Sequence, residues 1–179
     1  MGTVVHDHDK TFYSYGIGHQ ECTQHDIRYL IGSIQNEPGL TWNRQMLSLF
    51  RAMLHYRNGL PEGAQADPQV VFGFEKEYDS ILGKAEEEYT DEALNDDCRE
   101  GYNLFIRFRE YKENKLPFLH DTRVPANNPL CERLAGVYKR KQKQAVTLRS
   151  YKNLCCICDG LSVVYLLRLQ GENVYSEDS

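Results

Sequence analysis

The chain has 179 residues, 41% of them hydrophobic, and a formal net charge of −5. This length suits one domain with a core of its own, and this composition excludes a disordered chain. No apolar run approaches the roughly 20 residues of a membrane span, and His6, Asp7, His8 and Asp9 stand where a signal peptide would be basic and then apolar. A soluble, cytoplasmic protein without a membrane partner is therefore expected.

One strand and two helices are predicted in the first third of the chain. Residues 3–6 are mostly β-branched and predict a strand that ends at Asp7, and no later segment clearly indicates another strand. Apolar residues then recur at helical spacing over residues 21–35 and again over residues 42–58. The first third is thus expected to be mainly helical.

Two further helices are expected before the chain reaches a Pro-containing loop. Asp67 followed by Pro68 is a good helix start, and Thr90 can cap a fourth helix. Gly73 and Gly83 weaken the expected continuity of the third helix.

Two helices are predicted near the carboxyl end. Asn128 is a good N-cap and Pro129 suits the first helical position, so Glu132 falls in or next to the first turn, where the helix dipole favours an ionised carboxylate. A last helix, over about residues 151–169, is apolar nearly all round and is expected to be buried in a core. The polar tail, residues 171–179, is expected to be flexible.

The charge is unevenly distributed along the chain. Residues 62–100 contain 13 Asp and Glu against 3 Lys and Arg, whereas residues 123–152 contain 8 Lys and Arg against the single acid Glu132. A local excess of cations can bind a phosphate backbone even when the whole protein is acidic. The second segment is therefore a candidate DNA-binding region, although a basic run of this kind is also common as a solvated helix face.

In the helix that begins near Asn128, an acidic residue and two lysines are predicted to lie on the same face. At about 100° per residue, Glu132, Lys139 and Lys143 share one face. This combination is typical of metal-dependent enzymes that act on phosphodiesters. The candidate DNA-binding residues are Arg133, Lys139, Arg140, Lys141, Lys143 and Arg149.

Asp7 and Glu132 are the candidate metal ligands and the candidate catalytic residues. Carboxylate oxygens are the ligands that Mg²⁺ or Mn²⁺ prefers. Asp9 is a neighbouring alternative to Asp7. A second interpretation also stays open, in which Asp7 is only a turn residue and Glu132 only stabilises its helix dipole.

His19, Cys22 and His25 form a His-x-x-Cys-x-x-His run, which invites a zinc interpretation. On one continuous helix, however, these three side chains would spread over roughly 120° and would not converge on a tetrahedral ion. We therefore expect no structural zinc, with Cys22 in the core and His25 and Arg28 as polar groups near the candidate site.

Three sequence blocks resemble the carboxy-terminal part of transposases of the insertion sequence 66 family. The first is Val4-Val5-His6-Asp7 with Tyr13 following, the second is His19-x-x-Cys22-x-x-His25-x-x-Arg28-x-Leu30, and the third is Asn127-Asn128-x-x-x-Glu132-Arg133 with its basic continuation to Arg149-Ser150. The likeness extends from about Val4 to Leu169.

The resemblance implies a DDE transposase, in which an RNase H-like sheet presents two aspartates and one glutamate to two magnesium ions. Asp7 matches the second aspartate and Glu132 the glutamate, and the residues expected to support this site are Cys22, His25, Arg28, Asn127 and Asn128. The implied fold is mainly α, with an incomplete RNase H-like α/β core that retains one amino-terminal strand. Residues 1–35 and 115–170 would form this core, and residues 36–114 an all-helical insertion.

The family's first aspartate and its amino-terminal DNA-binding regions should precede Val4, where only three residues stand. We therefore expect a truncated transposase that does not cleave DNA by itself. Its expected partners are the element's DNA ends and target DNA, accessory proteins of the same element, and a second copy through self-association. The alternatives are a non-catalytic helical DNA-binding or interaction module, and a scaffold that binds a partner through its acidic segment.

Overall fold

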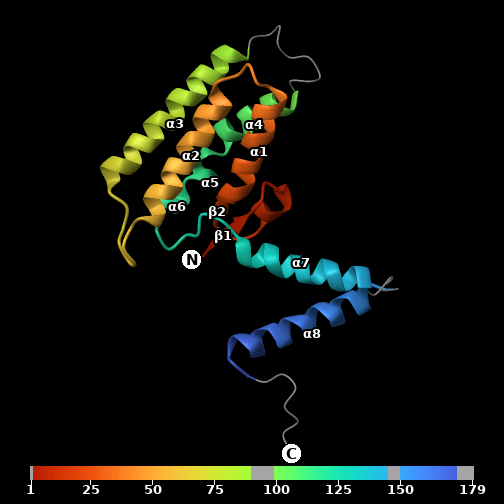
Figure 1. Ribbon diagram of the computed structural model, residues 1–179. Coiled ribbons are helices and arrows are strands. Elements are labelled where there is room, and N and C mark those ends of the chain that lie inside the picture. Colours follow the sequence, from red (N-terminus) through yellow and green to blue (C-terminus); the bar gives the residue numbers. More distant parts are fainter. Residues whose placement is uncertain (1, 90–98, 145–149, 173–179) are drawn as a thin grey trace, which may run out of the picture. The chain divides into compact units, whose positions relative to one another are not determined.

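The computed structural model describes residues 2–89, 99–144 and 150–172 (Figure 1). This part of the chain is mainly helical, with one small parallel sheet. It divides into two compact units, residues 1–128 and residues 129–179. The predicted cap Thr90, the DNA-binding candidate Arg149 and most of the predicted tail lie outside the described residues.

The sheet consists of strands β1 (Thr3–His6) and β2 (Gly18–Glu21), which pair in parallel and place His6 opposite Glu21. Strand β1 is as predicted, but the expectation of a single strand and of a helix that starts at residue 21 was wrong. The sequence Gly-His-Gln-Glu has no β-branched residue, so its extended form depends on hydrogen bonds to β1 rather than on local propensity. The short helix η1 (Lys10–Ser14) connects the two strands.

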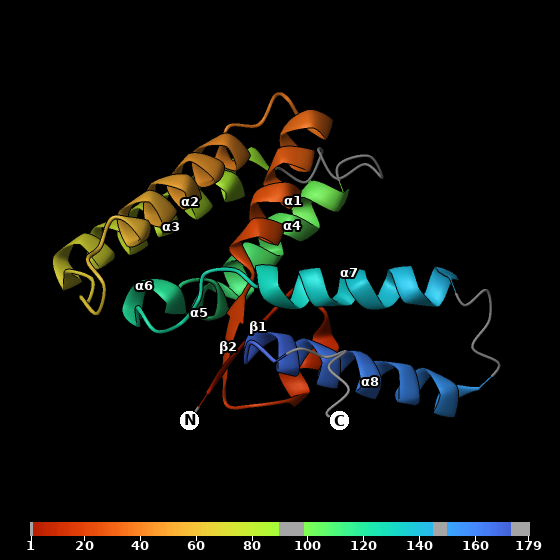
Figure 2. The same ribbon diagram turned by 60° about the horizontal axis from the view of Figure 1, so that its bottom comes forward.

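Four helices form most of the first unit (Figures 1 and 2). Their bounds are α1 Thr23–Asn36, α2 Trp42–Asn58, α3 Pro68–Glu88 and α4 Arg99–Glu110. Helix α2 packs between α1 and α3, and α4 packs against α1 and α3. Aromatic side chains dominate the core that they enclose, and the largest of these buried rings belong to Trp42, Phe50, Tyr78, Phe105 and Phe108.

Capping residues explain where two of these helices begin. Asp67 accepts a hydrogen bond from the Gln69 backbone N–H at 2.8 Å and starts α3, as predicted. Helix α3 then continues without a break through Gly73 and Gly83. Its last residue, Glu88, reaches back and accepts hydrogen bonds from the backbone N–H groups at the start of α2, at 2.9 and 3.2 Å.

Two short helices, α5 (Lys112–Lys115) and α6 (Pro117–His120), lead from α4 toward the sheet. The buried side chain of Gln20 connects them to β2: it accepts a hydrogen bond from the Phe118 N–H at 2.9 Å and donates one to the Lys115 carbonyl at 3.2 Å. Figure 2 shows β1 and β2 at the end of α1 and α4 where these short helices lie.

The second unit is a helical hairpin of α7 (Pro129–Gln144) and α8 (Tyr151–Leu169) (Figure 1). The Tyr138 hydroxyl of α7 hydrogen-bonds to the Cys158 carbonyl at 3.2 Å and to the Ser162 hydroxyl at 2.7 Å. Helix α8 has the predicted bounds, but none of its residues is buried, so the expectation of a core helix was wrong. Within the described ranges, no helix is long and apolar enough to cross a membrane.

Candidate functional site

Asp7 directly follows β1 and is half-buried. Its Oδ1 accepts a hydrogen bond from the Asp9 backbone N–H at 3.2 Å. The Asp9 carboxylate accepts in turn from the Thr11 N–H at 2.8 Å, which caps η1 and holds the pKa of Asp9 below its ordinary value. Asp9 therefore has a structural role of its own, whereas Asp7 stands at the carboxyl end of a parallel strand, where ligands commonly bind in α/β sheets.

Hydrogen bonds bring three distant segments of the first unit together at the strand ends. The Cys22 N–H donates to the His6 carbonyl at 2.7 Å, and the Thr23 N–H donates to the Ala126 carbonyl at 2.9 Å. The Asn128 side-chain amide donates to the Val5 carbonyl at 2.9 Å, across 123 positions of sequence. Segments from the first, second and third sequence blocks therefore meet at one end of the sheet.

Cys22 and His25 lie at the start of α1. Cys22 is 1% exposed and precedes the first helical residue, and its sulfur lies within 4.8 Å of a ring nitrogen of His25, close enough for the two to share a ligand. His19 is not on this helix, contrary to the expectation of one continuous helix: it belongs to β2, and its Nδ1 lies 3.2 Å from Nε2 of His6. The absence of structural zinc stays a prediction.

A buried ionic network lies beneath the sheet end, and the sequence did not reveal it. Lys115 is fully buried, and its ammonium group lies 2.7 Å from Glu21 Oε2 and 2.6 Å from Asp26 Oδ1. Arg107 forms a second ion pair with Asp26 at 3.2 Å. Two cations and two carboxylates thus balance in a region that is largely shielded from water, where each charge depends on the others.

Glu21 is the centre of this network. Its Oε1 accepts hydrogen bonds from His8 Nδ1 at 2.7 Å and from the Tyr13 hydroxyl at 2.5 Å. Burial alone would raise the pKa of Glu21, but the hydrogen bond from His8 and the charge of Lys115 outweigh it and hold this pKa far below its ordinary value. Burial and the Glu21 carboxylate both raise the pKa of Tyr13. Glu21 is therefore ionised at neutral pH, and it holds the loop that contains His8, next to Asp7.

The members of this network are 5 to 94 positions apart, and no spacing pattern connects them. Only the packing of α1, α4 and α5 around β2 brings them together. The one available signal was Asp26, which is four residues from both Cys22 and Leu30 and so shares an apolar helix face with them. A carboxylate at such a position needs a partner.

A pocket of about 580 Å³ lies beside this network, between α1 and α4. His8 and Lys10, from the segment after β1, also line it, as do Arg28 and Tyr29 of α1 and Arg107 of α4. Arg28, expected to support the site, therefore lines a pocket that adjoins the segment after Asp7.

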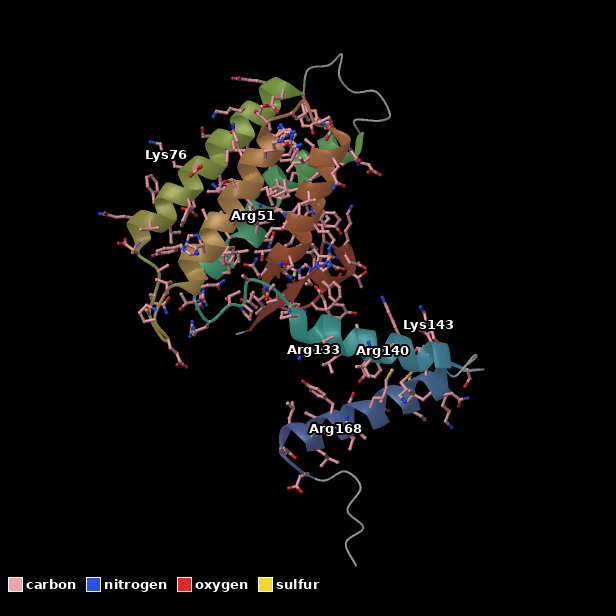
Figure 3. The ribbon with its side chains drawn as sticks, viewed as in Figure 1. Arg51, Lys76, Arg133, Arg140, Lys143 and Arg168 are labelled. Atoms are coloured by element: carbon pink, nitrogen blue, oxygen red, sulfur yellow. The ribbon has the colours of Figure 1, made fainter. Side chains whose placement is uncertain are left out.

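In the second unit, α7 carries the predicted cations along an exposed surface. Glu132 lies in its first turn and is exposed, and the helix is continuous through Lys143, so the predicted angles hold and Lys139 and Lys143 lie on the same side as Glu132. Lys141 projects toward the opposite side. Figure 3 shows Arg133, Arg140 and Lys143 along α7, and Arg168 on α8.

The predicted site residues thus divide between the units. Asp7, Cys22, His25, Arg28, Asn127 and Asn128 belong to the first unit, and Glu132 and the basic residues belong to the second. The pairing of Asp7 with Glu132 stays a prediction. No protein-family model, curated protein or solved structure matches the chain.

Proposed function

We propose that these 179 residues carry the carboxy-terminal part of the catalytic domain of a DNA transposase resembling the insertion sequence 66 family. The observation that carries the proposal is the meeting of three segments at the strand ends. Asn128 of the third block donates to the Val5 carbonyl of the first, and Cys22 of the second donates to the His6 carbonyl. Residues that the resemblance selects from distant parts of the sequence are therefore neighbours.

The fold is consistent with part of an RNase H-like core. In such a core, a carboxylate at the carboxyl end of a parallel strand forms part of the catalytic site, and Asp7 has this position next to β2. Helices α2, α3 and α4 then form the proposed helical insertion between the two acids. Their aromatic core is supplied largely by these helices themselves, as expected of an inserted subdomain.

Asp7 and Glu132 are the residues that would hold magnesium in this proposal, since both offer the oxygen ligands that this ion prefers. The bound ions would activate water and stabilise the leaving oxygen during phosphodiester cleavage. The resemblance assigns three carboxylates to the complete site, and these 179 residues supply the second and third. We therefore expect this polypeptide alone to bind DNA without cleaving it.

The remaining residues have binding and positioning roles. Among the described residues, Lys139 and Lys143 form no ion pair, so both remain available to DNA phosphates. The buried Glu21 holds His8 and so fixes the backbone immediately after Asp7.

The test compares Lys139→Gln with Lys76→Gln in the 179-residue protein. Both changes remove one exposed charge from a helix surface, but Lys76 lies on α3, outside the proposed DNA-binding helix. Binding to a labelled duplex, measured by fluorescence anisotropy at several salt concentrations, should weaken roughly fivefold for Lys139→Gln, with the salt slope reduced by about one. Lys76→Gln should change affinity less than about twofold.

Equal effects of the two substitutions would contradict the proposed DNA-binding face. Magnesium-dependent DNA cleavage by this polypeptide alone, abolished by Glu132→Gln, would contradict the expectation that it is inactive by itself. Affinity that does not change with salt concentration would contradict phosphate recognition by the cations of α7.

A further inference from the structure

The pocket between α1 and α4 has the size and construction of a ligand site. Its volume of about 580 Å³ lies within the range of small-molecule sites, about 300 to 1,000 Å³. Two facing helices of the rigid first unit form its walls, and His8, the residue after Asp7, lines one end. A ligand in this pocket would therefore lie beside the proposed catalytic carboxylate.

Two cations of this pocket have no partner within the described part of the chain. Lys10 and Arg28 are exposed and form neither an ion pair nor a hydrogen bond there. In contrast, Arg109 of α4 and Lys112 of α5 pair with carboxylates of α3 at 3.1 and 2.6 Å. The exposed cations at the pocket are thus available to an anionic group of a ligand.

One wall of the pocket combines aromatic rings with a guanidinium group that an ion pair holds in place. The Arg107 guanidinium lies 4.4 Å from the centre of the Tyr29 ring, and its ion pair with Asp26 holds it there. Tyr111 lines the pocket as well. Flat aromatic and guanidinium groups of this kind are the surfaces on which nucleobases stack.

The charge of the lining excludes a polyphosphate. Glu100 and Glu110 also line the pocket and offset the charges of Lys10 and Arg28, while Arg107 is balanced by Asp26. A nearly neutral interior suits an uncharged base, with a single phosphate at the exposed cations.

Amide and hydroxyl groups supply the remaining polar contacts. Asn36, Asn103 and Ser33 line the pocket, and side-chain amides can pair with the edge of a base.

We propose that this pocket holds one unpaired nucleotide of a DNA strand, with its base against the Tyr29 and Arg107 wall and its phosphate at Lys10 and Arg28. This inference rests on the proposed function, because it takes DNA to be the substrate. The protein would then recognise a DNA end partly through one base that is displaced from the double helix.

The test fills the pocket with a larger side chain and leaves its charged residues unchanged. Gly32 lines the pocket and has open space where a side chain would begin, so Gly32→Leu fills the pocket and suits the helix. Gly73 on α3 also has open space around it and lies outside the pocket, so Gly73→Leu is the matched control. Thermal melting of both variants verifies folding.

Binding is measured to three labelled duplexes: one with a single unpaired adenine, one with an abasic unit in its place, and a blunt duplex. The unmodified protein and Gly73→Leu should bind the unpaired adenine about tenfold tighter than the abasic form, from the stacking of one base. Gly32→Leu should lose this difference and keep its affinity for blunt DNA.

The inference is overturned if the unpaired adenine gives no gain, or if Gly32→Leu keeps the gain. If either result occurs while the protein still binds the blunt duplex, the proposed function is not contradicted. Binding of free dAMP that depends on Gly32, without any gain from unpaired DNA, would identify a free-nucleotide site and also overturn the inference. Failure to bind any duplex would remove the proposed function together with the inference.

Discussion

Lys115 has no exposed surface, and a lysine is seldom buried unless its charge is paired. Its ammonium group contacts Glu21 and Asp26, so removal of the amine leaves two buried carboxylates with fewer partners. We expect Lys115→Met to lower the free energy of unfolding by roughly 3–5 kcal/mol, as measured by urea denaturation.

Lys112 is the matched control for this substitution, because it lies three residues earlier and also forms a lysine–carboxylate pair, but at the surface with Asp79. Lys112→Met should cost less than about 1 kcal/mol. A similar cost for both substitutions would show that burial of the Lys115 network has no special role in stability.

Glu21 gives the protein a predictable response to acid. Its pKa lies below the ordinary 4.5 in the folded protein, so the carboxylate stabilises the fold at pH values above the unfolded pKa. This contribution is lost as the pH falls from about 5 toward the folded pKa. The free energy of unfolding should therefore decrease steeply in acid, and Glu21→Gln should flatten that slope.

Glu77→Gln provides the comparison, because Glu77 is exposed on α3. The free energy of unfolding of the Glu77→Gln protein should depend on pH in the same way as that of the unmodified protein. An unchanged slope in Glu21→Gln would mean that other carboxylates control the acid response.

The junction of α1 and α4 depends on a glycine. Glu37 is 7% exposed and accepts hydrogen bonds from Ser33 and Tyr89, each at 3.2 Å, and a β-carbon on Gly101 would lie 1.5 Å from its Oε2. Gly101→Ala must displace this carboxylate, so we expect a loss of roughly 1–3 kcal/mol in unfolding free energy.

Gly73→Ala tests whether this cost comes from the contact or from helix propensity. Gly73 lies inside α3 with nothing near its missing side chain, so alanine there should stabilise the protein by about 0.5–1 kcal/mol. Stabilisation by both substitutions in thermal denaturation would contradict the tight packing at Gly101.

The helices were largely predictable because their signals are local. Apolar spacing and turn residues give α2 the predicted bounds, and Asp67-Pro68 marks the start of α3. Strand β2 was missed, since its extended form comes from pairing with β1. Helix α8 was expected in a core because it is apolar nearly all round, yet within the described residues its unit supplies one neighbouring helix, α7.

The site was predictable only in part, for a similar reason. Asp7, Cys22 and Asn128 belong to sequence blocks that a resemblance can select, and the structure brings their segments together. The Lys115 network and the pocket arise from α4 and α5 packing against α1 and β2, and no pattern within one segment records such contacts.

For the whole molecule, the distribution of charge matters more than its sum. Acidic residues concentrate on α3, in the proposed insertion, while the cations of α7 face outward. The acidic residues and the proposed DNA-binding helix therefore belong to different segments of the chain. The exposed carboxylates of α3 also serve as a comparison in a metal titration, because two converging carboxylates should bind a divalent ion more tightly than single surface acids.

In the proposed function, Asp7 and Glu132 would together hold one metal ion. Titration of the 179-residue protein with Mn²⁺, followed by amide NMR, measures this most directly, because Mn²⁺ broadens resonances near the ion. We predict that amides around residues 7 and 132 broaden together at the lowest Mn²⁺ concentrations and that Asp7→Asn abolishes both effects. Broadening at only one of the two, or first along α3, would contradict the account.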